Sequence, residues 1–123
     1  MAKKILVAED EKPMAKILSM KLEHQGFEVT TVHDGAAVLD EVRKGPFDLV
    51  LLDLIMPKTD GFEVLNRMKH ENIEVPVIVT SNLSKEMEVK KAKDLGAVDY
   101  LVKTNVHLSE IVDRIEQYFN SSN

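Results

Sequence analysis

The chain has 123 residues, of which 44% are hydrophobic, and this size and composition predict one compact domain over residues 1–123, with no room for a separate output module. It contains no cysteine, which excludes disulfides, zinc–thiolate sites and thiol nucleophiles. Its formal net charge of -5 argues against direct nucleic-acid binding, which needs a basic face.

The chain shows neither a membrane segment nor a secretion signal. No apolar run approaches the roughly 20 residues that a membrane helix needs. The first four residues lead directly into a short strand-like run instead of a signal-peptide core. We therefore expect a cytoplasmic protein with no membrane partner, and the lack of cysteine fits a reducing compartment.

Five apolar runs alternate with five helical patterns, which is typical of an α/β fold with a parallel sheet. The first run, 5–8, is followed by a helix predicted over about 13–25. The second run, 27–31, alternates apolar and polar residues and suits a half-exposed edge strand. The runs at 49–52 and 75–80 are continuously apolar, so we expect them to be central strands.

The helices between the later strands are marked by capping residues and glycines. Asp34 is predicted to cap the second helix, which ends at Gly45. The third helix follows Asp60, and Ser84 is predicted to cap a fourth helix that Gly96 closes. Right-handed crossovers and an edge-like second strand then favour a doubly wound, flavodoxin-like sheet of five strands in the order 2-1-3-4-5.

The last two helices differ in how much they can bury. The fifth has a clean apolar stripe, made of Leu108, Ile111, Val112, Ile115 and Phe119. The fourth is rich in Glu and Lys and leaves only Met87, Val89, Ala92 and Leu95 to bury. We expect the fifth helix to pack firmly and the fourth to be loosely held and able to shift. Core filling is the role expected for Met14, Met68 and Met87.

Acidic residues follow two of the predicted strands. Glu9 and Asp10 end the first apolar run, and Asp53 ends the third, so neighbouring parallel strands would direct all three into one crevice. Two unit charges about 4 Å apart repel by roughly 4 kcal/mol at an effective dielectric near 20. Mg²⁺ removes such repulsion and typically needs only one or two protein carboxylates plus a phosphate. The pattern therefore predicts magnesium-dependent phosphoryl chemistry.

Further motif residues follow the strands beside these acids. The full set, each at a strand's carboxyl end, is Glu9, Asp10, Glu11, Asp53, Met56, Pro57, Asp60, Gly61, Thr80, Ser81 and Lys103. With these motifs the chain resembles a response-regulator receiver domain over nearly its whole length. The resemblance implies a phosphorylatable module of a two-component or phosphorelay pathway. It also implies a signalling protein that assists its own phosphorylation and dephosphorylation without being an enzyme in the usual sense.

The resemblance assigns roles to the acids. Asp53 would accept a phosphoryl group from the phosphohistidine of a histidine kinase or histidine phosphotransferase. Mg²⁺ would be bound by Asp10, Asp53 and the backbone oxygen of Ile55, with Glu9 acting through water. Lys103 would stabilise the charge on the phosphoryl oxygens.

The resemblance also implies a switch. Thr80 would donate its hydroxyl to the phosphoryl group, and the ring of Tyr100 would turn inward into the space it leaves. This would repack the face formed by the fourth helix, the fifth strand and the fifth helix, which an unknown downstream protein reads. A monomer is expected, and dimerisation through this face on phosphorylation stays open.

Two positions depart from the family pattern. Thr104 stands where receivers usually have proline, and because a cis bond to a non-proline residue costs about 3 to 4 kcal/mol, we predict a trans Lys103–Thr104 bond and a somewhat shifted loop. Apolar Ile55 stands two positions after Asp53, and Asn82 stands two positions after Thr80. In the family pattern these two positions flank the path of the hydrolytic water. We predict that Ile55 slows loss of the phosphoryl group.

Other classes of protein use some of the same residue types. A haloacid-dehalogenase type phosphatase also uses an Asp nucleophile and Mg²⁺, but it needs a second Asp where Ile55 stands, and no cap domain follows. A nucleotide or flavin binder would need glycines after the first strand. A degenerate receiver that acts only as a scaffold stays an alternative. The four histidines (His24, His33, His70 and His107) have no metal-ligand spacing, so solvated or structural roles are expected.

Overall fold

Five parallel strands form one sheet in the order β2-β1-β3-β4-β5 in a computed structural model, which describes residues 2–121. This confirms the doubly wound order predicted from the sequence. The strands are β1 Lys4–Ala8, β2 Glu28–Val32, β3 Leu49–Asp53, β4 Val77–Ser81 and β5 Asp99–Val102.

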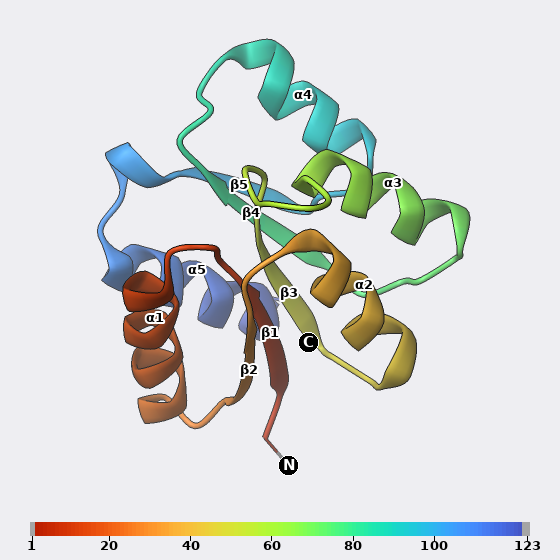
Figure 1. Cartoon of the computed structure of the whole chain (residues 1–123). Coiled ribbons are helices and arrows are strands. Elements are labelled where there is room, and N and C mark those ends of the chain that lie inside the picture. The colour runs from red at the N-terminus through yellow and green to blue at the C-terminus, as the bar shows by residue number, and fades with distance from the viewer. Residues whose placement is uncertain (1, 122–123) are drawn as a thin grey trace.

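Helices cover both faces of the sheet (Figure 1). The helices are α1 Lys12–His24, α2 Gly35–Lys44, α3 Gly61–His70, α4 Glu86–Asp94 and α5 Leu108–Ser121, and a 3₁₀ turn covers Lys103–Asn105. One apolar layer lies between the sheet and α1 with α5, and the other lies between the sheet and α2, α3 and α4. No helix within residues 2–121 is both long and apolar enough to cross a membrane.

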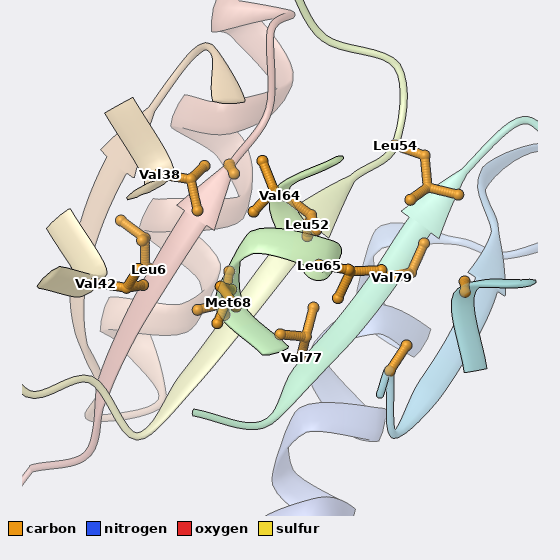
Figure 2. Packing of buried hydrophobic residues seen from close by; sticks show 14 of the residues in the cluster. Leu6, Val38, Val42, Leu52, Leu54, Val64, Leu65, Met68, Val77 and Val79 are labelled. Carbon is orange, nitrogen blue, oxygen red and sulfur yellow. The ribbon is translucent and has the colours of Figure 1, made fainter. Parts of the chain in front are cut away.

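Side chains alternate between the two layers along the central strands. In β3, Leu49 and Leu51 pack toward α1 and α5, whereas Val50 and Leu52 pack toward α2 and α3. Figure 2 shows this second layer, which includes Val38 of α2, Val64 of α3 and Leu52 of β3. Every residue of β3 and β4 is buried, while β2 is partly exposed, as expected for two central strands and one edge strand.

Three local predictions are wrong, namely the start of β4, the cap of α4 and the role of Met87. β4 begins at Val77, because Pro76 has no N–H to give to a ladder and only its carbonyl takes part, accepting the N–H of Val50 at 2.9 Å. Ser84 does not cap α4. The residue before the helix is Lys85, whose N–H donates to the carboxylate of Glu88 at 3.2 Å.

Met87 is not core filler, because 83% of it is exposed. Ala92 is the buried residue of α4, and Met87 lies five positions before it. In a helix of 3.6 residues per turn, this spacing places the two side chains about 140° apart around the axis. Met68, by contrast, is buried, and Met14 packs partly against the core. Since α4 buries so little, it is held by fewer apolar contacts than α5, which buries Ile111, Val112 and Ile115.

Candidate functional site

The acids meet at the carboxyl edge of the sheet because β1 and β3 are neighbours. Ala8 pairs with Leu52, so Glu9 and Asp53 follow side by side. One carboxylate oxygen from each of Glu9, Asp10 and Asp53 lies within 4.8 Å of the others. The structure therefore brings together all three acids that the sequence singled out.

Lys103 follows β5, which is separated from β3 by β4, and its side chain extends to this cluster. Its Nζ donates to Asp53 Oδ2 at 3.0 Å and also to Glu9 Oε1. The side chains of Lys103, Glu9 and Asp53 are only 8%, 2% and 6% exposed, so these ion pairs are largely shielded from water. When all four groups are ionised, three negative charges and one positive charge leave the cluster with two uncompensated negative charges.

Burial and the ion pairs act on the pKa values in opposite directions. Burial raises the pKa of Glu9 to about 6, against the hydrogen bond from Lys103, which lowers it. Burial also raises the pKa of Asp53, again opposed by Lys103. For Lys103, burial lowers the pKa, but its bonds to Glu9 and Asp53 outweigh this and raise it overall. The Lys103 ammonium is therefore charged at neutral pH.

The remaining oxygens of the cluster differ in their partners. Asp53 Oδ1 accepts the N–H of Ile55 at 3.1 Å, and Glu9 Oε2 accepts the N–H of Glu11 at 3.1 Å. Asp10 is exposed, and its carboxylate has no hydrogen-bond or ion-pair partner among residues 2–121. Oxygen donors with excess negative charge fit a hard divalent cation such as Mg²⁺, and Asp10 is the donor that is most open to one.

The hydroxyl predicted to assist lies next to Asp53. Thr80 in β4 pairs directly with Asp53 in β3, so both side chains project from the same face of the sheet. Thr80 is buried, as is Asp53. The side chain of Ile55 is 54% exposed beside this site.

Tyr100 lies in the layer on the α4 side of the sheet. Its ring is 9% exposed, and its hydroxyl donates to the carbonyl of Leu83 at 2.7 Å, in the loop that leads to α4. Burial raises the pKa of this phenol. The ring thus takes the inward arrangement, joined to the loop between β4 and α4.

Two contacts near the site were not predicted, although the sequence had marked Ser81 as a motif residue. Ser81 is fully buried, and its Oγ accepts the N–H of Leu83 at 3.2 Å, which closes the same loop. Nδ1 of His33 lies 2.9 Å from the backbone oxygen of Glu9. None of the peptide bonds within residues 2–121 is cis, so the Lys103–Thr104 bond is trans, as predicted.

A family model described as the response regulator receiver domain matches residues 5–116. The chain belongs to this family, whose members are the receiver domains of two-component systems. A relative from Bacillus subtilis, the uncharacterized transcriptional regulatory protein YkoG, is 36% identical over 111 residues, which are 90% of this chain and 48% of YkoG. The chain spans about half the length of the curated relatives it matches.

Solved structures agree with this assignment. The receiver domain of the Francisella response regulator 1452 superposes with a TM-score of 0.91 at 29% identity, covering 98% of this chain and 99% of that one. The phosphorylated cyanobacterial phytochrome response regulator RcpA gives a TM-score of 0.87 at 32% identity, covering 100% and 97%. The order of strands and helices is therefore that of known receiver domains.

Proposed function

We propose that Asp53 accepts a phosphoryl group from the phosphohistidine of a histidine kinase or histidine phosphotransferase. The observation that carries the proposal is the ion-paired cluster of Glu9, Asp53 and Lys103 beside the open carboxylate of Asp10. Outside phosphoryl chemistry this cluster is a liability, because its negative charges exceed its positive charge in a largely buried setting.

The reaction is a displacement at phosphorus. A carboxylate oxygen of Asp53 forms the new P–O bond while the P–N bond to the partner's imidazole breaks, and its electron pair returns to the ring nitrogen. Lys103, which stays charged, faces the oxygens of the transferred group and stabilises their charge. The Thr80 hydroxyl lies on the strand next to Asp53 and donates to the same group.

Mg²⁺ fits the donor set. Asp10, Asp53 and the backbone oxygen of Ile55 would hold it, and the ion would neutralise charge on the acids and on the phosphoryl oxygens. Both carboxylate oxygens of Glu9 already accept hydrogen bonds, one from Lys103 and one from the N–H of Glu11. Both oxygens of Asp53 also accept hydrogen bonds, from Lys103 and from the N–H of Ile55, so the role of Glu9 through water stays a prediction from the family resemblance.

The signal would leave the site through Thr80 and Tyr100. When Thr80 turns toward the phosphoryl group, the inward position of Tyr100 is favoured, and its bond to the Leu83 carbonyl carries this to the loop before α4. α4 buries only Ala92, so a small change in this loop can shift it. A downstream protein would read the resulting face of α4, β5 and α5.

Beryllofluoride with Mg²⁺ mimics a bound phosphoryl group and tests the proposal directly. NMR shift changes are expected at Asp53, Thr80 and Tyr100 in the parent protein and are expected to vanish in Asp53→Asn. Asp40→Asn, at an exposed acid on α2, is the matched control and keeps the response. A parent protein that does not respond would show that the chain is not an active receiver.

The exposed side chain of Ile55 carries a separate prediction. Ile55→Asn is expected to shorten the half-life of the phosphoryl group severalfold, because a polar side chain there admits and orients the hydrolytic water. The measurement is loss of label from the phosphorylated protein over time. Ile17→Asn replaces another exposed isoleucine, on α1, and should leave the half-life unchanged. An equal half-life in the Ile55 variant would rule out the shielding role.

A further inference from the structure

We propose that Asp34, the N-cap of α2, and Gly35, its first residue, form a clasp that positions the loop after β3 and thereby sets how tightly the site binds Mg²⁺. We call these two residues the α2 clasp. The loop, residues 54–60, carries the backbone of Ile55, and the inference rests on the proposed function because it concerns the same metal site. Nothing in the role of α2 as a packing helix requires this contact.

Gly35 is needed for space. A Cβ built on Gly35 would lie 1.8 Å from the carbonyl oxygen of Thr59 and 2.6 Å from its carbonyl carbon, far inside any tolerated contact. The obstacle is backbone, so it cannot move aside as a flexible side chain would. The N–H of Gly35 also donates to the carbonyl of Pro57 at 3.4 Å. The tip of the loop therefore rests directly on the start of α2.

Asp34 holds the same tip from a second direction. Its Oδ1 caps α2 by accepting the N–H of Ala37 at 2.8 Å, and its Oδ2 lies 3.6 Å from Nζ of Lys58. The Ala37 N–H, with help from Lys58, keeps the pKa of Asp34 below its usual range, so the carboxylate is charged at neutral pH. One side chain thus joins the helix end to the loop tip.

Backbone hydrogen bonds close the loop at both its tip and its base. Lys58 has a φ of 70°, and the N–H of Thr59 donates to the carbonyl of Pro57 at 2.9 Å, which makes the tip a tight turn. At the base, the N–H of Gly61 donates to the carbonyl of Leu54 at 2.8 Å.

Gly61 is itself close-packed on this base. A Cβ there would lie 2.6 Å from Cα of Leu54 and 2.9 Å from the carbonyl oxygen of Asp53. Ile55 lies between the closed base and the clasped tip. A shift at the tip therefore turns the peptide of Ile55 next to Asp53, where its N–H already binds Oδ1.

These contacts make Gly35 a positioning residue for the metal site. Groups that hold a metal ligand in place typically change metal affinity about 10- to 100-fold when they are altered. A purely structural role for Gly35 would instead lower the free energy of unfolding and leave the dissociation constant for Mg²⁺ unchanged. Measuring both the free energy of unfolding and the dissociation constant for Mg²⁺ therefore distinguishes a positioning role from a purely structural one.

The test compares the two glycines that flank α2. Gly35→Ala is expected to weaken Mg²⁺ binding by at least about tenfold, measured by NMR titration with Mg²⁺ alone. Gly45→Ala is the matched control, because a Cβ there meets nothing within 4 Å and its φ of -142° suits any residue. Its affinity should stay within about twofold of the parent protein. A folded Gly35→Ala protein with parental affinity would overturn the clasp.

A milder variant covers the case in which Gly35→Ala does not fold. Asp34→Ser keeps a good helix cap but cannot reach Lys58, and Asp40→Asn removes the same charge from the exposed side of α2. Asp34→Ser should bind Mg²⁺ severalfold more weakly than Asp40→Asn, and equal affinities would overturn the clasp. If the parent protein bound no Mg²⁺, the proposed function would be contradicted. The clasp is contradicted by a different result, in which the parent protein binds Mg²⁺ and the variants bind it equally well.

Discussion

The sheet buries two very different regions, an aliphatic layer against α5 and a charged cluster at its carboxyl edge. In the first, Ile115 is completely buried among other aliphatic side chains. In the second, Glu9 and Asp53 are also buried but are charged and held by one lysine. Burial stabilises the first region and raises the energy of the ionised acids in the second. The buried cluster therefore adds nothing that an aliphatic layer would not supply better, which supports a chemical role for it, and a bound cation would balance its excess negative charge.

The largest effect is expected from removing Lys103. Lys103→Ala leaves two buried carboxylates without their cation, and breaking a buried pair in this way costs about 3 to 5 kcal/mol. Urea unfolding in EDTA measures it. Adding Mg²⁺ should restore part of the loss, because the cation binds the folded state and replaces the missing charge. If the loss in free energy of unfolding were the same with EDTA and with Mg²⁺, the electrostatic explanation would be wrong.

A change in the aliphatic layer should respond differently. Ile115→Ala removes three buried carbons and is expected to lower the free energy of unfolding by about 2 to 5 kcal/mol. Unlike the change at Lys103, the loss relative to the parent protein should be the same in EDTA and in Mg²⁺, because no charge is involved. Urea unfolding under both conditions makes the comparison. A Mg²⁺-dependent loss would show that the two regions are coupled.

The pH dependence of stability isolates Glu9. Its pKa of about 6 in the folded protein lies above its ordinary value of 4.5, so the folded state favours the protonated form. Its stabilising contribution is therefore complete below about pH 4.5 and is lost as the pH rises through about 6. A difference of this size corresponds to about 2 kcal/mol.

The measurement is unfolding of the metal-free protein in EDTA between pH 4 and 7, with Glu9→Gln as the reference that does not titrate at this position. Relative to this variant, the parent protein should lose stability as the pH rises. A constant difference across the whole range would contradict the raised pKa of Glu9.

The smallest effect is expected at Asp10. Because this acid is exposed and adds to the negative charge beside Asp53, Asp10→Asn should raise the free energy of unfolding in EDTA by no more than about 0.5 kcal/mol. The same variant should lose the rise in thermal midpoint that Mg²⁺ gives the parent protein. If Mg²⁺ stabilised both proteins equally, Asp10 would not be a ligand.

Much of the fold was predictable because apolar periodicity reports directly on burial. The continuously apolar runs became β3 and β4, and Asp34 caps α2 as predicted. The third helix follows Asp60 as predicted, and the structure adds that the Asp60 side chain caps it. The errors fell where one residue decides a boundary or a helical phase. Pro76 delays β4, and Met87 points to solvent because it lies about 140° around α4 from the buried Ala92.

The order of elements follows from the residues alone, and so does the edge of the sheet at which the acids gather, since parallel strands end on the same side. The bonds from Lys103 to Glu9 and Asp53 span 94 and 50 residues of the chain, so they depend on how the whole chain folds. The same holds for the contact of Gly35 with Thr59. Distances and pKa values depend on which groups share a buried space, and no local pattern of residues specifies that.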